Sequence, residues 1–454
     1  MQNSAPSEPP ESQLLRLCRR PIDAAARARA CWTLLDWTGC ALAARNEPAA
    51  RAMGRALGFR DPMAQLSHAP SAQDAAFAAG ALGNVLEMDD LHRAAILHAG
   101  DTICPAALAV GLRRDTTGSA LLDAVVRGYE AAIRIGRVAA SGGYTPFYNS
   151  GTCGVFGAAI AAAELEGLDG TGMADALAQA GMQAAGIWQC RLEPGFSKQL
   201  ACAHAARAGV LSARLAAAGF AGPRRILTGP LGFFASFYPK ADPGTLAAPT
   251  ERWGIEEVSF KPWPACRHTH PAIAAALDLR GRLDGPPTAL ELRTYGAAIA
   301  FCDAPEPETD DAARFSLQHA VAVTLLRGAP GIADFGAAAR ADAEVAALRA
   351  RVTLVTDEAR DAAFPAAYGA TLIAEDAQGR RIEARCDAAP GDPEAPLSEA
   401  EIRTKFDANA RHGGVPAALA DRLAETLLAL PDAPDAGALA RALSNATTPE
   451  RETA

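Results

Sequence analysis

Apolar positions recur every three or four residues through most of the first 240 residues, and Gly or Pro closes each run. This spacing places apolar side chains on one face of an α-helix. Several runs are small or apolar nearly all round, which is typical of helices buried inside a bundle. The predicted helical segments include "FAAGALGNVLEMDD", "CPAALAVGLRR", "GSALLDAVVRGYEAAIRIGRVAA", "CGVFGAAIAAAELEGLDG" and "KQLACAHAARAGVLSARLAAAGF".

The pattern changes near residue 258. Strand-like alternation follows in "ALELRTYGAAIAF", "RVTLVTDE" and "ATLIAEDAQGRRIEARC", and the last contains a Gln-Gly turn typical of a hairpin. The helical period returns at "LSEAEIRTKF". We therefore predict a mainly α protein, in which both chain ends (1–258 and 398–454) form a large all-helical domain. A smaller α+β lid domain is inserted at 259–397.

Composition narrows the classes of partner. Half of the residues are hydrophobic and the net charge is −9, so no basic footprint supports nucleic-acid binding. An anionic small molecule needs only a local positive site. No apolar stretch is long enough to span a membrane, and the N-terminus "MQNSAPSEPPESQ" lacks the apolar core of a signal peptide. The ten cysteines form no C-x-x-C pair. We therefore expect a cytoplasmic protein with reduced thiols and no metal or cofactor.

Acids and histidines interrupt the apolar pattern in "LEMDDLHRAAILHAGD". The spacing of Phe77, Ala81, Val85 and Met88 predicts a helix that ends at Asp90. The helix dipole disfavours the negative charge of carboxylates in a last helical turn unless a cation lies close to them. The segment is consistent either with solvated acids at an exposed helix end or with a site that uses them.

Two further stretches mix polar groups with apolar helices. In "FYNSGTCG", Gly151 and Thr152 precede a buried helix, so the turn is either an anion site made of backbone N–H groups or merely a turn. In "GFSKQLACAH", Lys198 follows the predicted N-cap Ser197. The helix dipole there lowers the pKa of a lysine, whereas the alternative is a solvated surface side chain.

The segment "FKPWPACRHTHP" holds Lys261 and Cys266 in a chain stiffened by prolines. His268 and His270 lack a third ligand, which is weak evidence for a metal. Lysine is otherwise rare in this arginine-rich chain and occurs only at positions 198, 240, 261 and 405.

Six stretches in order resemble the MmgE/PrpD family, which includes 2-methylcitrate dehydratase, cis-aconitate decarboxylase and iminodisuccinate epimerase. The similarity spans almost the whole chain. It is carried by "LLDWTGCALAA", "EMDDLH…LHAGDTICPAALAVG", "SGTCGVFGAAIAAAELEGLD", "SKQLACAHAARAGVLSARLAAAGFAGP", "SFKPWPACRHTHPAI" and "ARFSLQHAVAVTLL".

The resemblance implies a homodimer with a metal-free site between helical domain and lid. It also implies that a small di- or tricarboxylate is bound and that a proton moves at a carbon next to a carboxylate. The implied catalytic residues are His98, Lys198, Tyr148 and Asp90. The implied substrate-binding residues are Glu87, Asp89, His92, Lys261, Cys266, Phe301, Gly151 and Thr152.

Departures from the family pattern bear on the reaction. Tyr148 aligns where decarboxylase-like members carry His, and Phe301 where they carry Tyr; Glu87 is the first acid of the D-x-D-D pattern. Losing these proton donors disfavours decarboxylation. We predict a dehydratase similar to 2-methylcitrate dehydratase. An epimerase of a dicarboxylate, and a catalytically silent carboxylate-binding scaffold, are the alternatives.

Overall fold

The computed structural model describes residues 8–114, 116–193 and 195–447 and divides into two compact units. Within the described residues, the first unit comprises 8–85, 89–258 and 399–447, and the second comprises 86–88 and 259–398. The strands β1–β4 all belong to the second unit. The α-helices of the first unit are α1 (Pro10–Cys18), α2 (Ala24–Ala44), α3 (Pro48–Leu57), α4 (Gln65–His68), α5 (Ala72–Gly80), α6 (Gly100–Gly111), α7 (Gly118–Ser141), α8 (Asn149–Thr152), α9 (Gly154–Leu165), α10 (Gly170–Gly181), α11 (Gln189–Leu192), α12 (Ser197–Ala217), α13 (Phe233–Phe237), α21 (Glu399–His412), α22 (Ala417–Leu428) and α23 (Gly437–Thr447). Its short 3-10 helices are η1 (Pro243–Thr245), η2 (Gly254–Glu257) and η5 (Leu430–Asp432).

The core of the first unit surrounds α9. Every residue of α9 except Glu164 is buried, and the helix packs against α6, α7, α10 and α12. Small residues allow the backbones to approach closely. A Cβ at Gly157 would lie 2.6 Å from the carbonyl oxygen of Gly128 on α7, a distance that no side chain can occupy. The Ala- and Gly-rich sequence of these helices is therefore a packing requirement.

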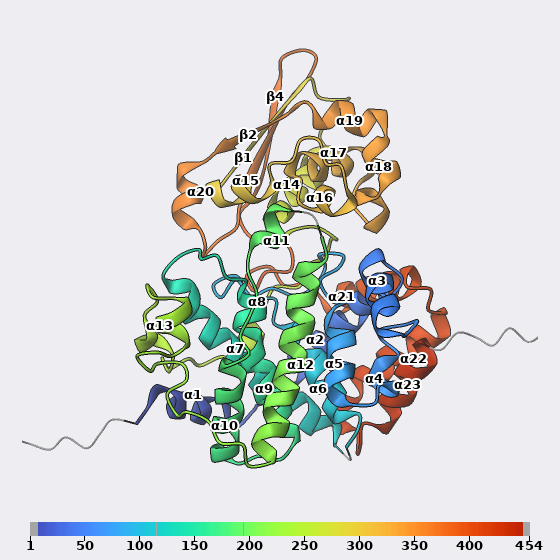
Figure 1. Cartoon of the computed structure of the whole chain (residues 1–454). Helices are drawn as coiled ribbons and strands as arrows, with labels where there is room; N and C mark the ends of the chain where they lie inside the picture. Colours follow the sequence, from blue (N-terminus) through green and yellow to red (C-terminus); the bar gives the residue numbers. More distant parts are fainter. Residues whose placement is uncertain (1–7, 115, 194, 448–454) are drawn as a thin grey trace, which may run out of the picture. The chain divides into compact units, whose positions relative to one another are not determined.

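A buried ion pair joins the two ends of the chain in the first unit. Nζ of Lys405 on α21 lies 2.6 Å from Oδ1 of Asp36 on α2, and both side chains are buried. Helices α2 and α21 pack along each other, although more than 350 residues separate them in sequence (Figure 1). Burial makes each charge depend on the other, because neither can be solvated by water.

The second unit has a four-stranded mixed sheet in the order β2-β1-β3-β4. Strand β1 pairs parallel with β2 and antiparallel with β3, and β3 pairs antiparallel with β4. Helix α14 packs on β3 and β4 and also against α17. The strands are β1 (Ala289–Thr294), β2 (Val352–Thr356), β3 (Ala370–Glu375) and β4 (Arg381–Cys386). The helices are η3 (Arg267–Thr269), α14 (His270–Arg280), α15 (Gly296–Cys302), α16 (Asp310–Arg314), α17 (Leu317–Arg327), η4 (Ile332–Phe335), α18 (Ala337–Ala341), α19 (Ala343–Arg349) and α20 (Glu358–Ala363).

The mainly helical class and the small sheet agree with the sequence patterns, and the predicted Gln-Gly hairpin is the β3–β4 connection. One strand prediction was too long. Strand β1 ends at Thr294, and "GAAIAFC" forms α15 instead. The segment is apolar throughout, which suits either structure, and the carboxylate of Asp361 accepts the N–H of Gly296 in the first turn of the helix.

The predicted helix ending at Asp90 was wrong. Helix α5 ends at Gly80, and residues 81–87 form successive turns. Glu87 has a φ of +54°, which no helix residue adopts. Gly80 and Gly83 interrupt the apolar spacing, so the acids lie in irregular backbone beyond a helix and not in its last turn.

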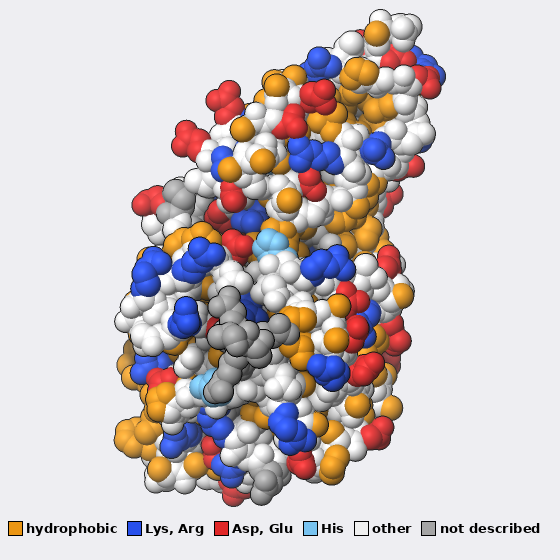
Figure 2. Space-filling view, turned by 90° about the vertical axis from the view of Figure 1, so that its right-hand side faces the viewer, with side chains coloured by type: hydrophobic (Ala, Val, Ile, Leu, Met, Phe, Trp, Pro, Cys, Tyr) orange, Lys and Arg blue, Asp and Glu red, His pale blue; other side chains and the backbone are white. Residues whose placement is uncertain are grey.

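Positive and negative side chains are interspersed on the face that Figure 2 shows. Among the described helices, none combines the length and the apolarity needed to cross a bilayer.

We expect Lys405→Met to destabilise the first unit by about 3–5 kcal/mol, because it leaves the Asp36 carboxylate buried without its counter-charge. Denaturation by urea measures this loss. Arg403→Ala on the same helix is the matched control: its partners Asp407 and Asp421 are 38% and 57% exposed, so the loss should be about 1 kcal/mol or less. Equal losses in the two variants would contradict the prediction.

Candidate active site

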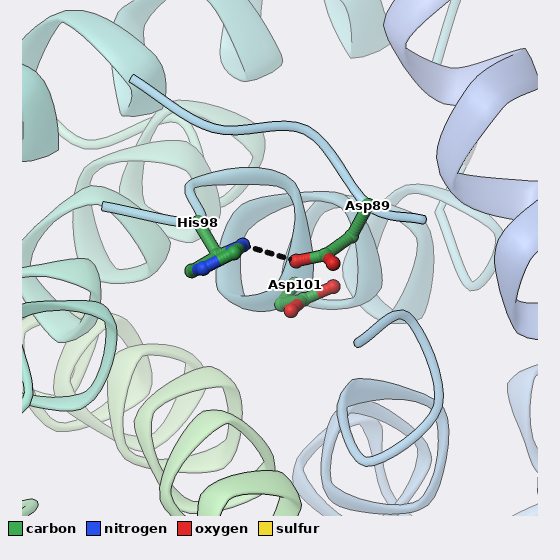
Figure 3. Close-up of side chains that lie close together, drawn as sticks. All are labelled: Asp89, His98 and Asp101. Carbon is green, nitrogen blue, oxygen red and sulfur yellow. Dashed lines mark ion pairs between the residues drawn. The ribbon is translucent and has the colours of Figure 1, made fainter. Parts of the chain in front are cut away.

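Three ionisable side chains of the first unit meet just before and within the start of α6. Backbone hydrogen bonds between His92 and Leu97 fold the preceding segment back on itself. This fold brings Oδ2 of Asp89 to 2.5 Å from Nδ1 of His98. Asp101, in the first turn of α6, lies beside both residues (Figure 3), and one ligand atom from each of the three is within 4.8 Å of the others.

Burial dominates the electrostatics of this group, which we call the Asp89–His98–Asp101 cluster. Asp89 and Asp101 are completely buried and His98 is 9% exposed. Desolvation, and then the adjacent charge of Asp89, raises the pKa of Asp101 well above its ordinary value. Two neighbouring carboxyl groups cannot both ionise cheaply in such a place. The cluster therefore carries fewer charges than its residues suggest.

Residues of α12 and the Gly turn surround the cluster. Burial raises the pKa of the Cys202 thiol well above its ordinary value, as it does for Asp101, and the charge of Lys198 in the first turn of α12 opposes both rises. The hydroxyl group of Tyr148 lies 3.6 Å from Sγ of Cys202 and 3.5 Å from Nδ2 of Asn84. Burial raises the pKa of the Tyr148 phenol well above 10, so the phenol is neutral.

The predicted N-cap of α12 was wrong. Ser197 is the first residue of the helix, and the N-cap position is Phe196, which offers no capping side chain. Lys198 nevertheless lies in the first turn, as the sequence indicates.

Two predicted site residues have their hydrogen bonds directed elsewhere. Asp90 accepts hydrogen bonds from the Tyr129 hydroxyl group at 2.7 Å and from the backbone N–H of Gly100 at 3.0 Å. His92 accepts the N–H of Ala95 through Nδ1, and its Nε2 lies 3.5 Å from Glu257. Burial lowers the pKa of His92. Neither residue belongs to the Asp89–His98–Asp101 cluster.

The Ser/Thr/Gly turn forms α8. The N–H groups of Gly151 and Thr152 both donate to the carbonyl oxygen of Tyr148. The hydroxyl group of Thr152 lies 2.6 Å from that of Tyr238. These two N–H groups therefore stabilise the turn itself, and the predicted backbone anion site does not form from them.

The remaining predicted residues belong to the second unit. Lys261 is completely buried; its Nζ donates to the carbonyl oxygen of Glu87 at 3.1 Å and lies 3.4 Å from the Glu87 carboxylate. A hydrogen bond with Cys302 lowers the pKa of the Cys266 thiol. The ring of Phe301 packs against that of His268, with 4.9 Å between the ring centroids.

His268 and His270 do not converge on a common point. Nδ1 of His268 lies 2.7 Å from the Tyr295 hydroxyl group, whereas Nε2 of His270 lies 3.1 Å from the carbonyl oxygen of Ala265. The weak His-x-His metal signal therefore has a structural explanation. The Asp89–His98–Asp101 cluster has a spacing that one divalent cation could reach, so a metal is the alternative that experiments on this cluster must test.

Both halves of the chain match known domains. Residues 15–246 match the MmgE/PrpD N-terminal domain, and residues 263–430 match the MmgE/PrpD C-terminal domain. The chain belongs to the MmgE/PrpD family.

Several characterised relatives of this family member are lyases. It is 29% identical to cis-aconitate decarboxylase of Mus musculus over 58% of this chain and 55% of that protein. It is also 29% identical to 2-methylcitrate dehydratase of Cupriavidus necator, over 73% of each chain. The match to cis-aconitate decarboxylase of Aspergillus terreus, again at 29%, covers 43% of each chain. The chain thus spans about half the length of these two decarboxylases.

In this MmgE/PrpD protein, Asp101, Cys202 and Asn84 were not among the site residues predicted from the sequence. The spacing of Asp101, three residues after His98 at the start of a helix, was the available signal. Cys202 follows Lys198 by one helical turn, so the two share a face of α12.

Asp90 should make the stability of the protein depend on pH. Burial raises the pKa of this carboxyl group to about 7, against about 3.9 in an unfolded chain. Its contribution is therefore fully present below about pH 4 and is lost as pH rises through 7. We expect wild type to lose up to about 4 kcal/mol relative to Asp90→Asn between these limits.

Denaturation by urea at several pH values measures this difference. Asp278→Asn is the control, because the Asp278 side chain is 56% exposed. Parallel stability curves for wild type and Asp90→Asn would show that Asp90 does not titrate in this range.

Proposed function

We propose that this protein is a metal-independent dehydratase that acts on a small di- or tricarboxylate, similar to 2-methylcitrate dehydratase. The observation that carries the proposal is the buried pair of Asp89 and His98. A carboxylate on Nδ1 fixes the imidazole so that Nε2 is the atom able to exchange a proton, as in other acid–base sites built on histidine. Membership of a family that contains lyases supports the same reaction type.

The proposed reaction begins at the carbon next to a substrate carboxylate. Nε2 of His98 removes the proton from that carbon, and the electron pair of the broken C–H bond forms a C=C bond. The C–O bond to the neighbouring hydroxyl group breaks, and the hydroxide leaves as water with a proton from Lys198. Negative charge develops on the substrate carboxylate during this step, so a nearby cation lowers the barrier.

Lys198 is the proposed acid because its helix position favours the neutral form after proton donation. It lies in the first turn of α12, where the helix dipole opposes a positive charge. In the second unit, Lys261 is the proposed carboxylate ligand. Its completely buried Nζ is held by Glu87, which keeps the charge in place without water.

Two other functions start from the same scaffold. An epimerase of a dicarboxylate would share the first proton removal and then return the proton to the opposite face. A catalytically silent carboxylate-binding protein would not need Asp89 to orient His98. Reaction in D2O separates the three: loss of water marks a dehydratase, deuterium incorporation with inversion marks an epimerase, and neither marks a silent protein.

His98→Ala and Lys198→Ala should each lower kcat by about 10²-fold or more, because each removes a proton-transfer group. The assay follows dehydration of 2-methylcitrate and citrate-type acids, with circular dichroism to check folding. Lys240→Ala is the control lysine variant. Activity should survive EDTA treatment. Wild-type turnover in both site variants would place the chemistry elsewhere.

Itaconate formation from cis-aconitate should be negligible. Decarboxylation leaves a carbanion that must be protonated. Phe301 offers no proton, and the buried phenol of Tyr148 has a pKa raised well above 10. Chromatographic analysis of products from cis-aconitate and from citrate-type acids in parallel measures the preference. Itaconate released at a rate comparable to the dehydration rate would contradict the assignment.

A further inference from the structure

We propose that Asp101 is a positioning residue that keeps one proton in a hydrogen bond with Asp89, so that Asp89 carries the single negative charge that orients His98. The importance of this arrangement for turnover rests on the proposed function. The hydrogen bond between Asp101 and Asp89 is independent of that function, and it can be tested without a substrate.

Burial and geometry favour a proton shared between the two acids. Neither oxygen of Asp101 accepts a hydrogen bond from any N–H or O–H group of the described residues, although the side chain is completely buried. Its carboxyl group instead lies beside that of Asp89 (Figure 3), and an oxygen of each is within 4.8 Å of the other. Two carboxylates have no donor to share, whereas a carboxylic acid and a carboxylate have one.

The backbone at Gly83 permits this close packing. A Cβ at Gly83 would lie 1.9 Å from Oδ1 of Asp101 and 2.7 Å from Nε1 of Trp37. Any other residue would therefore displace the Asp101 carboxyl group from its position. The turn that ends the helical pattern after α5 thus supplies the space that the acid needs.

The charges facing Asp101 favour one negative charge on the pair. Asp90 and Asp89 face it from the irregular segment, and Lys198 faces it from α12. Arg29 acts on Asp90, and Lys405 acts on Asp89 but is itself paired with Asp36, so the group still holds more acids than cations. Other titratable neighbours stay neutral because burial raises their pKa values; these are Cys40, Cys104, Tyr148 and Cys202. A second carboxylate charge would have no counter-ion of its own.

One negative charge on Asp89 has a chemical consequence for His98. The charged carboxylate lies 2.5 Å from Nδ1 and favours a proton on that atom, so the neutral imidazole keeps Nε2 without a proton. If Asp89 instead carried the proton, it would donate to Nδ1 and Nε2 would hold the hydrogen. Asp101 thereby selects the tautomer of His98 that can remove a proton.

Substitutions at Asp101 separate this role from a merely structural one. In Asp101→Asn, the amide N–H replaces the acid O–H as the donor to Asp89. In Asp101→Ala, the donor is lost. We expect kcat of the Ala variant to fall about tenfold or more, the equivalent of one hydrogen bond, and the Asn variant to recover most of it. Equal losses in the two variants would overturn the proposal.

The tautomer of His98 gives a second readout that needs no turnover. Nitrogen chemical shifts of ¹⁵N-labelled histidine, assigned with His98→Gln, should show Nδ1–H in wild type and in Asp101→Asn. Asp101→Ala should shift the population toward Nε2–H. A tautomer unchanged in Asp101→Ala would overturn the proposal. Correct tautomers in a protein that turns over no carboxylate would overturn the proposed function alone.

A titration with metal ions tests the alternative that the Asp89–His98–Asp101 cluster binds a metal. Titration of the purified protein with Zn²⁺ and Mn²⁺ should give no stoichiometric binding that depends on Asp101. Binding of one equivalent to wild type that disappears in Asp101→Asn would identify the three residues as ligands and would overturn the proton-sharing arrangement.

Discussion

The cost of holding charge away from water constrains this protein more than any other single factor. Helices of the first unit approach so closely that water has no access to the acids between them. Each buried carboxyl group is therefore stabilised by its own partner: Asp36 by Lys405, Asp90 by two hydrogen bonds and Asp89 by His98. The need for such a partner explains why these acids, the lysine and the histidine occur within an otherwise apolar sequence.

The same constraint explains why acids of similar sequence context differ in chemistry. No more than three positions separate Glu87, Asp89 and Asp90, yet each side chain contacts a different partner. Glu87 holds a lysine of the second unit, whereas Asp89 and Asp90 turn toward groups of the first unit. A run of carboxylates thus provides three separate functions, because the irregular backbone points each side chain in its own direction.

Periodicity predicted the helical class and the hairpin, since both depend on local spacing and turn chemistry. It failed after Gly80 and after Thr294, where the same apolar spacing continued through a change of backbone. The sequence directed attention to His98 and Lys198. The spacing of Asp101 from His98 was visible, but its role was not, because that role depends on a turn at Gly83 and on burial, neither of which has a local sequence signature.

The contact between α2 and α21 has a consequence for the order in which the protein can assemble during synthesis. Asp36 leaves the ribosome hundreds of residues before Lys405, and domains generally fold as they emerge. The first unit cannot bury α2 in its final state until the last part of the chain has been made. The second unit is nearly continuous in sequence and can fold first. Until α21 arrives, α2 must expose an apolar surface to the cell, which makes this helix the segment most in need of protection by a chaperone.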